Sequence, residues 1–291
     1  MKPLPLLAAL AIASWAAAVS AVAAPIAVVA AENFYGDVAR QIGGDHVAVS
    51  SVLSSPDQDP HLFEASPSTA RLLSGAKIVI SNGADYDPWM EKLLAATKAP
   101  GRIEIVVADL AHKKRGDDPH IWYDPAAIKA LAQRLNADLA AIDPAHKADY
   151  ARRKAAFLAS LKPLEAKIAA MKIKYAHAPV TASEPVFGYM AQALGLDMRN
   201  QRFQLAVMNN TEPSVSAVAA FENDLRGHKV RVMLHNAQAS APAVQRLVKL
   251  AREEKIPVVG VTETKPAGKS YQQWMLSQLD ALDKALAGAT P

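Results

Sequence analysis

Short runs of β-branched residues alternate with helical patterns along most of this chain, and this alternation restricts the fold more than any other feature. The candidate strands are residues 26–30, 47–53, 78–81, 103–107, 180–182, 230–234 and 258–262. Between them, Ser66-Pro67 and Asp124-Pro125 place a proline at the first position of a helix. Strands and helices in regular alternation predict an α/β fold with parallel-type sheets.

The stretch from Pro144 to Met171 interrupts this alternation, because it is polar and contains no candidate strand. Its apolar residues are spaced by four and three, as on one face of an α-helix; they are Phe157, Leu161, Leu164, Ile168 and Met171. A helix of this length would span roughly 40 Å, with a kink or interruption about one turn before Pro163. We therefore expect a helix that connects two α/β lobes.

The first residues have the features of a signal peptide. Lys2 is followed by an apolar stretch, and Ala21-Val22-Ala23 offers a cleavage site. The apolar stretch is too short to predict a transmembrane anchor. The chain then divides into four expected segments: a signal peptide (1–23), an N-terminal α/β lobe (24–143), a linking helix (144–172) and a C-terminal α/β lobe (173–291).

The sequence contains no cysteine, which removes both a disulfide framework and the residue that would carry a lipid anchor. A signal peptide without an anchor predicts a free periplasmic protein. The formal net charge is +4, and the tight cationic cluster Lys113-Lys114-Arg115 is interpreted as a solvated loop. We expect no nucleic-acid partner and a monomeric chain.

Two short motifs, Asp59-Pro60-His61 and Asp118-Pro119-His120, each place a histidine directly after a proline. Proline fixes its own φ and keeps the preceding residue extended, so each histidine is expected on a stiff, non-helical corner. Neutral imidazole is the commonest metal ligand in proteins. Two imidazoles held in this way predict the beginning of a cation site.

Ligands in open α/β sheets bind beyond the carboxyl ends of the strands. His61 and His120 follow two candidate strands of the first half, and Glu184 and Glu263 follow two of the second half. Two lobes facing each other would bring these four side chains together in the cleft between them. Two neutral imidazoles and two carboxylates carry a charge of −2, which a divalent Zn²⁺, Mn²⁺ or Fe²⁺ ion cancels. Glu64 and Asp118 are candidates to orient the two imidazoles through their other nitrogens.

These residues resemble the metal-binding receptors of bacterial ABC importers, in the zinc- and manganese-receptor group (cluster A-I) with a rigid helical backbone. The resemblance covers the mature chain and rests on both Pro-His motifs, the Asn82-Gly83 turn followed by Trp89, the linking helix, Thr181-x-x-Glu184-x-x-Phe187-x-Tyr189 and the turn at Glu263. It implies two lobes joined by one long rigid helix. It also implies the ligands His61, His120, Glu184 and Glu263 and an ABC permease as partner.

Two positions depart from the family pattern. Glu263 stands where relatives commonly have Asp, and Asn236 lies in a segment where they often have Glu; His235 is a possible substitute ligand. Zinc-specific members often carry a long His-rich loop before the second ligand, whereas residues 111–117 are short and cationic with one histidine. Together with Glu as third ligand, this favours Mn²⁺ over Zn²⁺ as the transported ion, with Fe²⁺ as a further candidate.

The sequence disfavours three other functions. A periplasmic metallohydrolase needs an open coordination position and a general base, yet the sequence has no His-Glu-x-x-His helix. A receptor for a metal chelate or another small ligand would need a wide aromatic cleft, but aromatic residues make up only 6% of the chain. A surface adhesin is disfavoured by the absence of an anchoring cysteine. We therefore expect a transport protein and not an enzyme.

Overall fold

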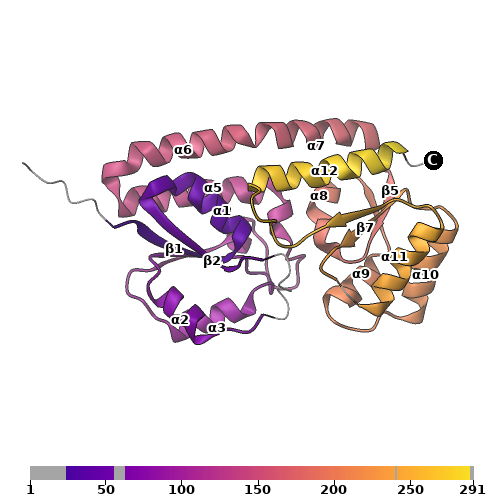
Figure 1. The fold of residues 1–291 in the computed structure, drawn as a ribbon, viewed down its shortest axis with the longest axis horizontal. Helices are drawn as coiled ribbons and strands as arrows, with labels where there is room; N and C mark the ends of the chain where they lie inside the picture. Colours follow the sequence, from indigo (N-terminus) through magenta and orange to yellow (C-terminus); the bar gives the residue numbers. More distant parts are fainter. Residues whose placement is uncertain (1–23, 56–62, 240, 289–291) are drawn as a thin grey trace, which may run out of the picture.

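The computed structural model describes residues 24–55, 63–239 and 241–288 of the 291-residue chain. Two α/β lobes lie side by side, and a long helical segment runs along both of them (Figure 1). The expected signal peptide and His61 lie outside the described residues. No described helix combines the length and the apolar character needed to cross a membrane.

The N-terminal lobe contains a four-stranded parallel sheet in the order β2-β1-β3-β4. Its strands are β1 (Ile26–Glu32), β2 (Val47–Leu53), β3 (Ile78–Ser81) and β4 (Ile103–Val106). Its helices are α1 (Asn33–Gly43), α2 (Pro67–Ser74), α3 (Pro88–Ala96), α4 (Val107–Leu110) and α5 (Pro125–Ile142), with 3₁₀ turns η1 (Gly44–His46), η3 (Ile121–Tyr123) and η4 (Pro144–His146). The order places β1 and β3 in the middle of the sheet and β2 and β4 at its edges.

The C-terminal lobe repeats this design with the order β6-β5-β7-β8, again all parallel. Its strands are β5 (Pro179–Ala182), β6 (Asp197–Arg199), β7 (Val232–Asn236) and β8 (Val258–Val261). Its helices are α8 (Gly188–Ala193), α9 (Gln201–Met208), α10 (Val215–Arg226), α11 (Pro242–Glu253) and α12 (Tyr271–Gly288), with the 3₁₀ turn η5 (Pro185–Phe187). The predicted α/β class with two parallel sheets is confirmed.

Local sequence signals account for the starts of α2 and α5. Ser66 caps α2 by accepting a hydrogen bond from the Thr69 backbone N–H, and Asp124 caps α5 in the same way for Ala126. Such caps satisfy N–H groups that have no partner inside the helix. The starts predicted at Ser66-Pro67 and Asp124-Pro125 are therefore correct.

The connecting segment consists of two consecutive helices, α6 (Lys147–Ser160) and α7 (Lys162–Tyr175). The break falls at Leu161, and Pro163 lies in the first turn of α7, where its missing N–H does no harm. Leu161 and Leu164 are fully buried. In Figure 1 the two helices run nearly in line along both lobes, with α12 beside α7. The interruption expected near Pro163 is present without a sharp change of direction.

One hydrophobic core extends through both lobes and the connecting helices. It includes Ile80 of β3, Trp122 of η3, Leu161 of the connector, Phe187 of η5 and Trp274 of α12. Because apolar side chains of the two lobes pack against one another, separating the lobes would expose buried apolar surface to water. The lobes are thus held together by packing as well as by the connecting helices.

Candidate metal centre

His120 lies between β4 and α5, at the carboxyl edge of the N-terminal sheet, and its side chain is completely buried. Its Nδ1 is 2.6 Å from Oδ1 of Asp118, which also accepts the His120 backbone N–H at 3.1 Å. An ionised carboxylate only accepts hydrogen bonds, so the imidazole proton belongs on Nδ1. Nε2 then carries a lone pair, and it has no hydrogen-bond partner among the described residues.

Glu263 reaches the same point from the other lobe. It follows β8, is 2% exposed, and places Oε2 4.0 Å from Nε2 of His120. Tyr86 of the N-terminal lobe donates its hydroxyl to the same oxygen at 3.0 Å. Because bonds from a transition metal to imidazole nitrogen or carboxylate oxygen are about 2.0–2.2 Å long, one ion can bridge these two atoms after a small inward movement.

Glu184 lies two residues after the end of β5 and is half-buried beside Glu263. The side-chain amide of Asn236, at the end of β7, donates to Oε2 of Glu184 at 2.5 Å and to Oε1 of Glu263 at 2.7 Å. One amide group therefore bridges the two predicted acidic ligands and reduces the repulsion between them. It occupies one oxygen of each carboxylate.

The bridging role of Asn236 was missed by the sequence analysis, which ended the strand at residue 234, whereas β7 continues to Asn236. Applying the strand-end rule to the corrected end of β7 would have found it. His235 is not part of the same arrangement, because successive side chains of a strand point to opposite faces. Burial, together with the charge of Arg252, lowers the pKa of His235.

The two predicted orienting acids are in different situations. Asp118 makes the expected hydrogen bond to His120. Glu64 is exposed, and its predicted partner His61 lies outside the described residues. Among the described residues, His120 and Glu263 thus approach each other to 4.0 Å, and Asn236 links Glu263 to Glu184.

The cavity at these acids is small and polar. It measures about 40 Å³ and is lined by Glu184, Val207, Met208, Asn210, Asn236, Gln238, Ala239 and Glu263. This volume is comparable to that of a single water molecule. It suits a bare or partly hydrated ion better than a chelate of many atoms.

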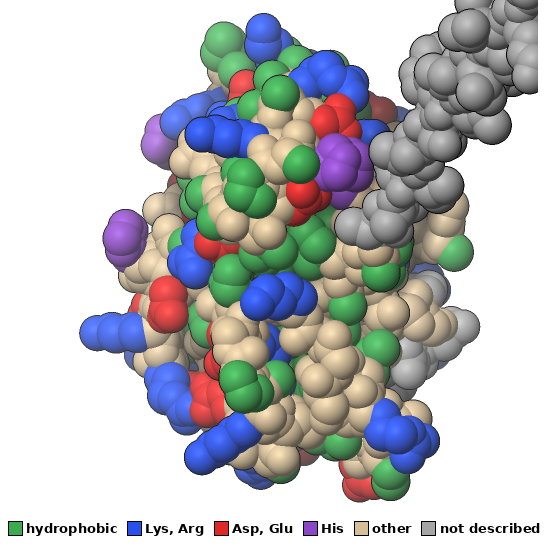
Figure 2. All heavy atoms as spheres, turned by 90° about the vertical axis from the view of Figure 1, so that its left-hand side faces the viewer, with side chains coloured by type: hydrophobic (Ala, Val, Ile, Leu, Met, Phe, Trp, Pro, Cys, Tyr) green, Lys and Arg blue, Asp and Glu red, His purple; other side chains and the backbone are tan. Residues whose placement is uncertain are grey.

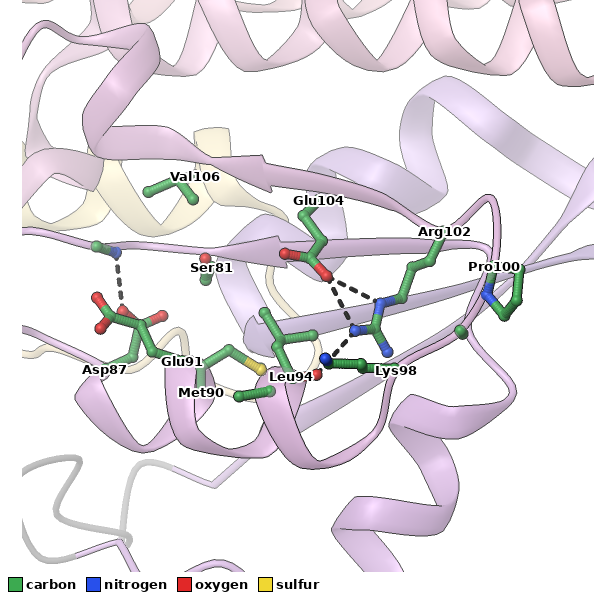
Figure 3. A pocket seen from close by; sticks show the side chains of 13 residues that line it. Ser81, Asp87, Met90, Glu91, Leu94, Lys98, Pro100, Arg102, Glu104 and Val106 are labelled. Atoms are coloured by element: carbon green, nitrogen blue, oxygen red, sulfur yellow. Dashed lines mark hydrogen bonds and ion pairs between the residues drawn. The ribbon is translucent and has the colours of Figure 1, made fainter.

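A larger hollow of about 630 Å³ lies away from these ligands, between α3 and the edge strand β4 (Figure 3). Arg102 lines it and donates to Oε1 of Glu104 at 2.9 and 3.1 Å. At its inner end, Asp87 accepts the backbone N–H groups of Asn82 and Gly83, and burial raises the pKa of Asp87 to about 6. The hollow contains none of the predicted metal ligands.

Hydrogen bonds between the lobes surround the candidate centre. The side-chain amide of Asn33 donates to the backbone oxygen of Lys265 at 2.7 Å and accepts its N–H at 3.0 Å. The Tyr189 hydroxyl donates to the Asp118 backbone oxygen at 2.7 Å. These bonds fix the distance between the histidine-bearing edge and the glutamate-bearing edge.

A family model described as "ZnuA: Zinc-uptake complex component A periplasmic" matches residues 28–285. The chain belongs to the ZnuA family. This assignment confirms the resemblance drawn from the Pro-His motifs. It places the chain among the substrate-binding proteins of metal transporters and not among enzymes, as the sequence analysis predicted.

Several relatives of this ZnuA-family chain are described as transport proteins. It is 23% identical over 281 residues to the iron ABC transporter substrate-binding lipoprotein MtsA of Streptococcus pyogenes, covering 89% of this chain and 88% of MtsA. It is 27% identical over 184 residues to the manganese ABC transporter substrate-binding lipoprotein PsaA of Streptococcus pneumoniae, covering 58% of this chain and 59% of PsaA.

Solved structures agree with the fold of the chain. The periplasmic zinc binding protein TroA of Treponema pallidum superposes with a TM-score of 0.77 at 17% identity, over 90% of this chain and 99% of TroA. A Mn-bound periplasmic metal binding protein from Candidatus Liberibacter asiaticus gives a TM-score of 0.73 at 18% identity, with the same coverage. At these identities the structures establish the two-lobe fold and not the bound metal.

Proposed function

We propose that this chain captures a divalent transition-metal ion between its lobes and delivers it to the membrane permease of an ABC importer. The observation that carries the proposal is the approach of His120 Nε2 and Glu263 Oε2 to 4.0 Å in a buried site formed by both lobes. A buried carboxylate beside a buried imidazole with an available lone pair is an arrangement that a cation stabilises.

The proposed ligands are His61, His120, Glu184 and Glu263. Asn236 and Tyr86 support this assignment, because they hold the two carboxylates by hydrogen bonds without contributing negative charge. The two glutamates then balance the charge of one divalent ion. His61 enters the proposal through its motif alone.

Mn²⁺ is the ion we favour, with Zn²⁺ and Fe²⁺ as the alternatives. Two carboxylates among four ligands weaken the advantage that imidazole and thiolate sites give to Zn²⁺. The relatives do not decide the question, because their descriptions name manganese, iron and zinc. Zn²⁺ can still bind more tightly than Mn²⁺ in solution, since it stands higher in the Irving–Williams order.

A receptor for a metal chelate is the alternative from the sequence analysis, and the cavity of about 40 Å³ argues against it.

The contacts between the lobes determine how far the lobes can move relative to each other. The bonds of Asn33 to Lys265 and of Tyr189 to Asp118 favour small movements. We propose that residues 24–143 and 173–291 act as the two lobes and residues 144–172 as a stiff connector.

The proposed location is the periplasm, where a monomer of the mature chain would bind the ion before docking on the permease. On the sequence features described above, we expect residues 1–23 to direct export and the mature chain to carry no lipid anchor. Mass spectrometry of the periplasmic fraction would test both, because the mature chain should begin after Ala23 and carry no added lipid mass.

Titration of chelator-stripped protein with Mn²⁺ and Zn²⁺ tests the proposed function. Calorimetry should give tight one-to-one binding of Mn²⁺, with a rise in unfolding temperature of the kind expected when a ligand binds only the folded state. Binding should weaken at least tenfold in His120→Ala. Failure of both ions to bind more tightly than millimolar would overturn the proposal.

A further inference from the structure

A second group of metal-capable side chains lies far from the interlobe cleft, at the beginning of the connecting helix. His46 ends η1, while Asp143 and His146 belong to the turn between α5 and α6. One potential ligand atom from each of these three residues lies within 4.8 Å of the other two. Figure 2 faces this end of the molecule, where histidine side chains lie beside acidic ones.

The two imidazoles are stacked, with ring centroids 3.9 Å apart and an interplanar angle of 24°. Each ring also contacts a different carboxylate. His46 Nε2 lies 3.0 Å from Oδ2 of Asp149, and His146 Nδ1 lies 2.6 Å from Oδ2 of Asp143. The rings are thus fixed against each other from two sides.

Asp149 contacts His46 as outer-shell carboxylates do in metal sites, where they hold the second nitrogen of a ligating histidine. An ion bound by both His146 and Asp143 would replace the hydrogen bond between their Nδ1 and Oδ2 atoms. Asp149 accepts hydrogen bonds from Nε of Arg153 and from Nε2 of His46, both at 3.0 Å. His46 Nδ1 then carries the lone pair. The Tyr150 hydroxyl donates to Asp143 at 2.8 Å and holds that carboxylate in place.

We propose that His46, His146 and Asp143 form a second binding site for a divalent transition metal, with Zn²⁺ as the preferred ion. Two imidazoles and one carboxylate are a donor set typical of zinc, which leaves a fourth position for water. The three side chains are 24% to 45% exposed, so an ion can enter directly from solvent. The ion would cross-link the turn after α1 to the start of α6.

This inference is independent of the proposed function, and its test removes the interlobe site first. In a His120→Ala, Glu263→Gln background, Zn²⁺ should still bind at one site per chain with micromolar affinity. Adding His146→Ala should weaken that binding at least tenfold. Adding His177→Ala instead should leave it unchanged, because exposed His177 has an aspartate neighbour at 3.6 Å and stands outside the cluster.

His146→Gln serves as a second variant and keeps the shape of the side chain, in case the alanine variant unfolds. Solution NMR of the imidazole ¹⁵N signals provides a direct readout, since Zn²⁺ should shift the resonances of both His46 and His146. The proposal is overturned if the background protein binds no Zn²⁺, if His146→Gln binds Zn²⁺ as tightly as its parent, or if neither resonance shifts.

Discussion

Asp118→Asn isolates the contribution of one hydrogen bond to metal binding. Asp118 lies 2.6 Å from His120 Nδ1 and is the group that fixes the proton on that nitrogen. The amide can still accept a hydrogen bond, but it has lost the charge and can also turn its NH₂ group toward the ring. The variant therefore weakens both the orientation of the imidazole and the electron density at Nε2.

The expected loss of metal affinity follows from the strength of the hydrogen bond between Asp118 and His120. A hydrogen bond to a charged group contributes about 1.5–3 kcal/mol, and the Asp118 side chain is 26% exposed, so water competes for part of it. Loss of outer-shell partners typically costs 10–100-fold in metal affinity, which corresponds to about 1.4–2.7 kcal/mol. We expect Asp118→Asn to weaken Mn²⁺ binding within this range.

Competition of stripped protein against a fluorescent chelator measures the change, with Asp117→Asn as the matched control. Asp117 is the adjacent residue and loses the same charge, yet its side chain accepts the Lys114 backbone N–H at 3.0 Å. If both variants bind Mn²⁺ as tightly as the wild type, the reasoning about the His120 tautomer is refuted. If both weaken it equally, net charge is responsible and the hydrogen bond is not.

Three further results are expected. Asn236→Leu removes the donor between the two glutamates and should weaken Mn²⁺ binding three- to tenfold in the same competition assay; unchanged binding would show that the amide does not hold them. Hydrogen bonds from Lys167 and Tyr175 lower the pKa of Asp283 to about 2 from an ordinary 3.8. The stability from this carboxylate is therefore present above about pH 4 and is lost as the pH falls through about 2. Asp283→Asn should lower the free energy of unfolding by about 1–2 kcal/mol at pH 7 and leave it unchanged near pH 1.5. Urea unfolding across this pH range measures the difference, and an equal loss at both pH values would contradict the prediction. Leu161→Ala should lower the free energy of unfolding by about 2–5 kcal/mol, because Leu161 is fully buried between α6 and α7. The same urea unfolding measures this loss.

The fold could be predicted from the sequence where local signals and tertiary packing agree. β2 and β3 have the predicted limits, because their β-branched residues are bounded by polar turns. β6 was missed, since Asp197, Met198 and Arg199 include no β-branched residue and form a strand only by pairing with β5 at the sheet edge. Pairing of this kind depends on contacts distant in sequence.

The candidate site was predictable to a similar extent. The strand-end rule predicted that His120, Glu184 and Glu263 lie at facing sheet edges, because parallel strands end at one edge of a sheet. In the structure His120 and Glu263 lie 4.0 Å apart. It could not reveal that Asn236 bridges the two glutamates, since that contact depends on where β7 ends and how two side chains turn. Hydrogen bonds between side chains leave little trace in a single sequence.

Anomalous diffraction from crystals grown with one equivalent of Mn²⁺ tests the central claim most directly. We predict one dominant manganese peak between the lobes, about 2.0–2.3 Å from His120 Nε2 and from a carboxylate oxygen of Glu263, with Glu184 and His61 completing the coordination. A dominant peak elsewhere, or full occupancy in crystals of His120→Ala, would contradict the claim that the two lobes capture the ion at this site.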